Sequence, residues 1–210
     1  MTISQALLLF TAAAGLLTVT PGLDTLLVLR AAIAEGPRRA LLAGAGICAG
    51  CLVWGLVVAL GLGALFAVST LAYDALRYAG AAYLLWLGVQ LLRKPRTRID
   101  VAPLTNARRS HAASFARGLL TNLLNPKMGV FYVSFLPQFV PAGVDIVAFS
   151  TLLAAIHAML GLLWFLLLAL ATQPLNRWLA RPAAVQALDR AAGGAFVLFG
   201  LRLATASRPA

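Results

Sequence analysis

Charged residues are scarce in this 210-residue sequence: Asp, Glu, Lys and Arg make up 11% of it, and hydrophobic residues make up 61%. This composition excludes an ordinary soluble domain, in which about a quarter of the residues are charged. Four stretches contain no charged residue at all, namely 1–23, 40–73, 128–144 and 146–176. Because about 20 apolar residues cross a bilayer as a helix, we predict an all-α integral membrane protein.

The sequence also has only two cysteines and two histidines. Cys48 and Cys51 lie within an apolar stretch, where we interpret them as small packing residues. A metal site would need further ligands, and neither His111 nor His157 is near this pair in the sequence. We therefore expect no metal and no cofactor. The sequence offers no set of nucleophile, base and metal ligands either, so we expect no enzyme.

Acidic residues number only 6, against 17 basic ones, most of which fall in three segments, 30–39, 93–117 and 177–190. No basic-aromatic module accompanies them, so nucleic acid is not an expected partner. We predict six spans, near residues 4–29, 40–67, 71–92, 113–139, 145–171 and 186–206. The basic segments then all lie on the cytoplasmic side, as the positive-inside rule requires, and both termini lie outside. Since positive charge follows the first span and does not precede it, we expect that span to remain uncleaved.

The two halves of the sequence resemble each other. The tetrapeptide "GLLT" at 15–18 recurs at 118–121, and "RYAGAAYLLWLGVQL" from Arg77 resembles "RAAGGAFVLFGLRL" from Arg190, with Gly88 aligned to Gly200. We predict two three-helix repeats, residues 1–92 and 113–210, joined by a basic cytoplasmic linker, residues 93–112. With three spans each, the repeats have opposite orientations in the membrane, an arrangement typical of secondary transporters.

Helix-breaking residues occur at corresponding places in spans 1 and 4. Pro21-Gly22 and Pro126 interrupt them, and each proline leaves the carbonyl four residues earlier, of Leu17 or Asn122, without its helical partner. Non-helical backbone survives in a bilayer only against protein or a wet cavity, so we predict a substrate site at these breaks. Nearby side chains add polar groups, those of Thr18, Thr20, Asn122 and Asn125.

Each break is followed closely by a charged residue. Asp24 and Lys127 are intramembrane charges, which mark a functional site by default. A purely structural Asp24–Lys127 ion pair is the competing interpretation. His157, near the middle of span 5, is either a proton carrier or a neutral residue hydrogen-bonded to a neighbouring helix.

Small residues in span 2 predict a close helix contact. Gly46-xxx-Gly50 allows another helix to approach, either within the chain or across a homodimer interface, and the pattern does not choose between them.

Several motifs together resemble the LysE/RhtB family of bacterial amino-acid exporters. They are "TPGLD", "EGPRRALLAGAGICAG", "YLLWLGVQLL" and "GLLTNLLNPKMGVFYVSFLPQF", which follow the family's order over nearly the whole chain. The first motif usually carries Pro-Gly-Pro, where this sequence has Leu23, and this substitution should loosen the break slightly.

The resemblance implies efflux of amino acids or related metabolites, homoserine-like, threonine-like or otherwise neutral, across the bacterial inner membrane. It implies that the proton-motive force drives the export. On this basis we expect Asp24 to face a substrate ammonium or to carry a proton, and Lys127 to face a carboxylate. We expect Gln138 and Phe139 to close the outer end of span 4. Export of a metal ion or another non-amino-acid solute is the alternative, weakened by the scarcity of carboxylate, thiol and imidazole ligands.

Overall fold

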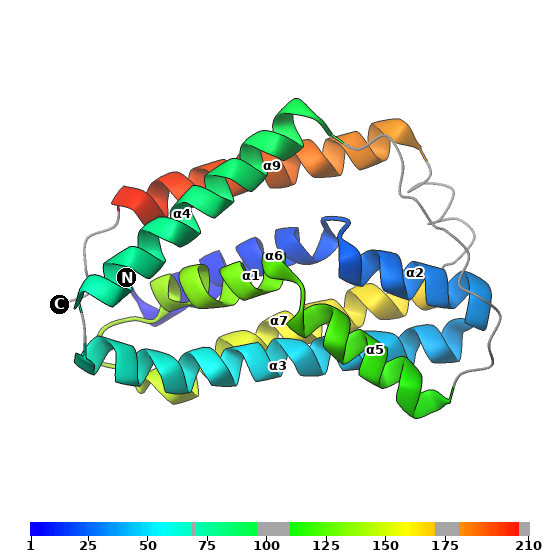
Figure 1. The fold of residues 1–210 in the computed structure, drawn as a ribbon, viewed down its shortest axis with the longest axis horizontal. Helices are drawn as coiled ribbons and strands as arrows, with labels where there is room; N and C mark the ends of the chain where they lie inside the picture. The colour runs from blue at the N-terminus through cyan, green and yellow to red at the C-terminus, as the bar shows by residue number, and fades with distance from the viewer. Residues whose placement is uncertain (69, 96–109, 171–180, 206–210) are drawn as a thin grey trace.

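The computed structural model describes residues 1–68, 70–95, 110–170 and 181–205, which form helices with no strand among them (Figure 1). The first half contains four helices, α1 (Ile3–Val19), α2 (Leu23–Glu35), α3 (Pro37–Val68) and α4 (Thr70–Arg93). The second half contains α5 (His111–Leu123), α6 (Pro126–Val130), the π-helix η1 (Phe131–Phe135), the 3-10 helix η2 (Leu136–Phe139), α7 (Ile146–Leu170) and α9 (Pro182–Thr205). Most of the predicted linker, residues 93–112, lies outside the described residues.

The helices form a bundle with a separate pair along one side. Helix α3 packs against α5 and α7, and α1 and α2 pack on α7 and α3 respectively. Helices α4 and α9 pack mainly on each other and cross at the upper edge of Figure 1, with narrower contacts to α3, α6, η1 and α1. The last described helix of each half therefore belongs to this pair, and the other described helices build the bundle.

Length and composition identify three helices, among the described residues, as able to cross a membrane: residues 37–61 of α3, α7, and residues 182–202 of α9. The pair α1 and α2, bent by 50°, would add a fourth span. Predicted span 4 is divided into helices of 13 residues or fewer, and α4 is a 24-residue helix that includes Asp74 and Arg93. The all-α prediction is confirmed, and the six-span arrangement remains a proposal.

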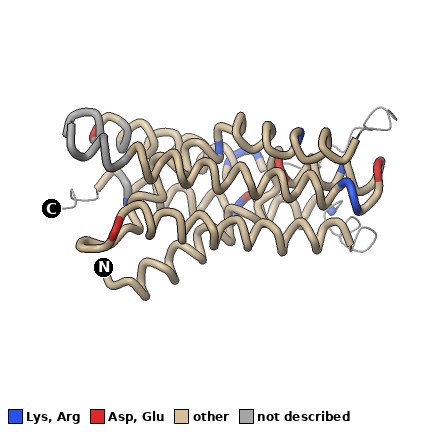
Figure 2. The backbone as a smooth tube through the Cα atoms, turned by 90° about the horizontal axis from the view of Figure 1, so that it is seen from below, with Lys and Arg blue, Asp and Glu red and all other residues tan. Residues whose placement is uncertain are grey.

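The surface is that of a protein surrounded by lipid. Figure 2 shows charged residues at only a few places along the tube. Large apolar side chains on several helices are exposed, among them Leu8, Leu124, Leu170 and Leu198. An exposed apolar surface of this extent is expected to face hydrocarbon, where it carries no penalty.

Both predicted helix breaks are present. Helix α1 ends at Val19 and α2 begins at Leu23, which leaves Thr20, Pro21 and Gly22 between them. In the second half, Pro126 is the first residue of α6, a position where its missing N–H has no helical partner to lose. The breaks therefore act as starts of new helices and not as kinks within continuous ones.

The contact predicted from Gly46-xxx-Gly50 is made within the chain, between α3 and α5. A Cβ on Gly46 would collide with the carbonyl oxygen of Phe115, and one on Gly118 would collide with that of Ala43. At Gly50 an added Cβ would lie 2.9 Å from the Asn122 Cβ. These three glycines let α5 approach α3 closely enough to place Asn122 against the first half of the protein.

Candidate functional site

The Asp24 carboxylate is buried in the first turn of α2 and held by two amides from the second half of the protein. Its Oδ2 accepts a hydrogen bond from Asn122 Nδ2 at 2.9 Å, and its Oδ1 accepts one from Asn125 Nδ2 at 3.3 Å. The helix N-terminus also favours a negative charge in this turn. The sequence predicted all three residues as site candidates, and the structure brings them into direct contact.

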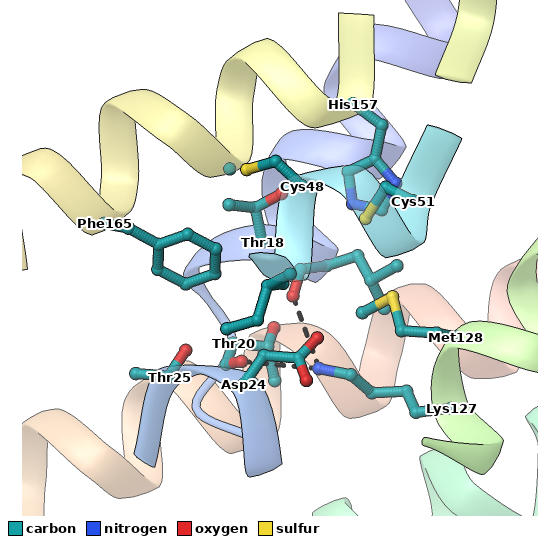
Figure 3. Close-up of a pocket in the computed structure, with 13 residues that line it drawn as sticks. Thr18, Thr20, Asp24, Thr25, Cys48, Cys51, Lys127, Met128, His157 and Phe165 are labelled. Atoms are coloured by element: carbon teal, nitrogen blue, oxygen red, sulfur yellow. Dashed lines mark hydrogen bonds between the residues drawn. The ribbon is translucent and has the colours of Figure 1, made fainter. Parts of the chain in front are cut away.

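Lys127 occupies the second position of α6 and reaches the break in the other half. Its Nζ donates to the carbonyl oxygens of Leu17 and Thr20, each at 3.5 Å, and Figure 3 shows its ammonium directed toward Asp24. The Leu17 carbonyl is the one that Pro21 leaves without a helical partner. A Cβ on Gly22 would lie only 2.9 Å from Nζ, so glycine at this position makes room for the ammonium.

The second freed carbonyl, that of Asn122, is bonded as well. It accepts the backbone N–H of Asn125 at 3.0 Å and the indole Nε1–H of Trp54 at 3.5 Å. At the breaks where we predicted a substrate site, both freed carbonyls are therefore bonded within the protein. An unpaired carbonyl costs several kcal/mol in hydrocarbon, so donors from the opposite half, Lys127 and Trp54, bond to both.

The two threonines beside the first break are bonded to their own helix. Thr18 Oγ1 donates to the Ala14 carbonyl at 2.7 Å, and Thr20 Oγ1 donates to the Leu16 carbonyl at 2.6 Å. Their hydroxyl protons are therefore already used, although their oxygens can still accept a hydrogen bond. Asn125 caps α6 through its Oδ1, which accepts the Lys127 N–H at 3.1 Å.

His157 of α7 is buried and paired with a residue that we did not predict. Its Nδ1 lies 3.0 Å from the hydroxyl oxygen of Tyr132, and the two rings are stacked with centroids 5.6 Å apart. Tyr132 is fully buried in the π-helix η1. A π-helical turn often marks a functional site, but the sequence does not reveal that such a turn forms here. For this reason sequence reasoning missed Tyr132.

Asp24, Lys127 and His157, with both threonines, line one small cavity (Figure 3). Its volume is about 20 Å³, which is room for about one water molecule and not for an amino acid. Its walls come from both halves and include Thr18, Asp24, Cys48, Lys127 and His157. We call this set the polar centre.

Gln138 and Phe139, the two residues predicted to close the outer end of span 4, lie in η2. Phe139 is buried in η2, and its ring packs on Phe10 and Phe135 with centroid distances of 5.5 and 4.8 Å. Gln138 is partly buried beside it. Cys48 and Cys51 are buried free thiols, and among the described residues no three His, Cys, Asp or Glu side chains are grouped to hold a metal ion.

Comparison with known proteins decides the family. Residues 15–207 match the family described as LysE type translocator. The chain belongs to the LysE family. It is 29% identical over 205 residues to the membrane protein YrhP of Bacillus subtilis, with 94% of this chain and 98% of that protein covered.

Two further relatives have names that state a transport activity. A homoserine/homoserine lactone efflux protein of Salmonella typhimurium is 34% identical over 191 residues, which is 91% of this chain and 92% of that protein. A threonine efflux protein of Salmonella typhi is 32% identical over 190 residues, which is 88% of this chain and 90% of that protein. No solved structure matches this LysE-family chain.

Leu23, where the family motif usually has its second proline, is the first residue of α2, and its side chain is exposed. The first position of a helix accepts proline readily because the N–H there has no intrahelical partner. In this LysE-family chain the helix begins at the same place with leucine, and the break is kept.

Proposed function

We propose that this protein is a secondary transporter that exports neutral amino acids, or closely related small metabolites, from the cytoplasm. One observation carries the proposal: the polar centre joins an acid from one half to a base from the other, each beside a helix break. The LysE family and the homoserine and threonine efflux relatives support the same substrate class.

A zwitterionic substrate would replace bonds that the protein makes to itself. Its ammonium would take the place of the Asn122 and Asn125 amides at the Asp24 carboxylate. Its carboxylate would bind the Lys127 ammonium in place of the Leu17 and Thr20 carbonyls. Because both charges have internal partners when the centre is closed, release of the substrate leaves no isolated buried ion, which would cost several kcal/mol.

The membrane topology that we propose has six spans in two inverted repeats, residues 1–92 and 113–210, with both termini outside the bacterial inner membrane. The packing of α4 on α9 supports the repeats. A Cβ on Gly88 would lie 2.7 Å from the Gly193 carbonyl oxygen, and one on Gly200 would lie 3.1 Å from that of Ala81. Under the alignment that pairs Gly88 with Gly200 and Gly80 with Gly193, the first contact corresponds to one between Gly200 and Gly80, which is one residue from the contact at Ala81. A near match of this kind supports two inverted copies.

Proton coupling is assigned to Asp24 and His157 in this proposal. Asp24 can carry a proton or bind an ammonium, and so a proton and a substrate would compete for it. His157 faces the same cavity, and its Nδ1 is held by Tyr132, which leaves Nε2 as the remaining nitrogen. If a proton displaces the substrate from Asp24, proton entry is coupled to substrate release.

The test is export from cells that overproduce the protein. We expect threonine, homoserine or another neutral amino acid to accumulate in the medium faster than in cells that carry Asp24→Asn at the same membrane level. Accumulation by the parent strain that is no faster than in cells without the protein would refute amino-acid export, and equal accumulation in the parent and Asp24→Asn strains would remove the role of Asp24. Collapse of the proton gradient should stop export by the parent protein, and export that continues would remove the proton-coupling part alone.

A further inference from the structure

A second space lies directly behind the break in the second half. It is a groove of about 650 Å³ between α4, the middle of α3 and the segment from the end of α5 into η1. This volume falls in the range of small-molecule sites and is far larger than the polar centre. Among the described residues that line it none is charged, and its largest side chains are Trp54, Tyr83, Leu123, Leu124, Val130 and Val133.

The wall between the groove and the polar centre is one side chain thick. Asn125 lines the groove, and its Nδ2 donates to Asp24 in the polar centre. Its neighbours divide between the two spaces, because Pro126 faces the groove and Lys127 faces the polar centre. The Asn125–Asp24 bond, at 3.3 Å, is longer and weaker than the Asn122–Asp24 bond at 2.9 Å. Of the two amides, Asn125 is therefore the easier one to displace.

Trp54 fixes the opposite side of the groove. Its indole N–H is bonded to the Asn122 carbonyl, and its ring would lie 3.3 Å from a Cβ on Gly129. The ring thus stays against the break and presents an apolar face to the groove. A ligand anchored at Asp24 and Lys127 that pushes the Asn125 amide aside would meet this apolar surface next.

We propose that the groove binds the apolar side chain of the exported amino acid, and that the protein therefore prefers substrates such as leucine over alanine or threonine. The inference rests on the proposed function, since the polar centre must hold the ammonium and carboxylate. Each buried methylene favours binding by roughly fourfold, so leucine should exceed alanine by about tenfold or more in transport efficiency. The occupant is the substrate side chain, and a lipid chain is the rival outcome of the test.

The experiment measures uptake of labelled leucine, threonine and alanine into inverted membrane vesicles that contain the full-length protein. Ala79→Phe fills the groove from α4, and Val133→Phe fills it from the opposite wall in η1. Each variant should lower leucine transport by about tenfold and leave alanine transport within about twofold of the parent value. Ala82→Phe is the matched control, because Ala82 is exposed one turn further along α4 and does not line the groove.

The outcomes separate the inference from the proposed function. Absence of transport for all three amino acids would contradict the proposed function itself. Transport of alanine and leucine at equal efficiency by the parent protein would overturn the inference and leave the proposed function standing. Preference for leucine that neither filling variant reduces would overturn it too, and would assign the groove to lipid. Alanine transport is measured in the same vesicles, so a variant that fails to fold is recognised by its loss of alanine transport. The other of the two variants, Ala79→Phe or Val133→Phe, then tests the groove.

Discussion

Lys127 Nζ lies 3.5 Å from the carbonyl oxygen of Leu17, the residue four positions before Pro21. A side chain from the second break thus bonds the backbone group that the first break releases. Trp54 does the converse, since it comes from the first half and bonds the Asn122 carbonyl released by Pro126. Each freed carbonyl is therefore bonded by a side chain from the other half of the protein, Lys127 of α6 or Trp54 of α3.

A side chain at Gly22 should slow transport, because this glycine lies against the Lys127 ammonium. Gly22→Ala would place a Cβ 2.9 Å from Nζ and push the ammonium away from the Leu17 and Thr20 carbonyls. We expect export to fall by about 10- to 100-fold, as misplacement of a site group by about 1 Å can do. Gly15→Ala is the control, because nothing lies within 4 Å of its Cβ position, and it should export at the parent rate.

Pro126→Ala should restore a backbone N–H beside the Asn122 carbonyl. This N–H would compete with Trp54 and Asn125 for the oxygen and draw α5 and α6 into one helix. We expect export to drop by roughly tenfold, the equivalent of about one hydrogen bond, with normal amounts of protein in the membrane. Pro141→Ala, in the turn after η2, serves as the control. Export at the parent rate by Pro126→Ala would show that the break is dispensable.

The positions of both breaks, and the candidates Asp24, Asn122, Asn125 and Lys127, could be predicted because proline, glycine and intramembrane charge are visible residue by residue. The bonds between them could not, since Asn122 and Asp24 are 98 residues apart in the sequence and their contact depends on how α5 is rotated against α3. For the same reason the sequence did not reveal that the freed carbonyls are bonded. The π turn that buries Tyr132 against His157 leaves no hydrophobic period of its own in so apolar a segment.

An ion pair between Glu35 and Arg117 should stabilise the end of the bundle where α2 stops. Arg117 Nη2 lies 2.7 Å from Glu35 Oε1, and the Glu35 side chain is only 8% exposed. Arg117→Met would leave this carboxylate with Arg39, whose Nη1 lies 4.0 Å from Oε2. Because Arg39 still compensates the carboxylate in part, we expect the free energy of unfolding in detergent to fall by less than the about 3–5 kcal/mol that follows when a buried charge is left without any partner. The exposed Arg38, changed to Met, should have little effect, and an equal loss in both variants would contradict the assignment.

The six-span topology can be tested with reporter fusions. Fusions after Arg39 and within residues 98–110 should both report a cytoplasmic location, because both positions fall in basic segments. A fusion in the turn after η2, at residues 141–144, should report the opposite side. A periplasmic result at both basic segments would overturn the topology and the inverted repeats together.

Asp24 and Lys127 either bind the substrate or only hold the two halves together, and their single and double variants decide between these roles. Asp24→Asn leaves the ammonium beside an uncharged side chain, and Lys127→Met leaves the carboxylate with amides alone and the Leu17 carbonyl without its Nζ donor. Each single change should abolish export or reduce it at least about 100-fold, since an uncompensated buried charge costs several kcal/mol. Unfolding temperature in detergent should fall in both.

The double variant Asp24→Asn, Lys127→Met removes both charges at once. Neither partner is then left uncompensated, so the unfolding temperature should recover toward the parent value. Export should not recover, because a zwitterionic amino acid would find no partner for either of its charges. Recovery of stability with export still absent would therefore support substrate binding by the pair. Recovery of both would mean that Asp24 and Lys127 are a structural ion pair, and that the substrate is bound elsewhere.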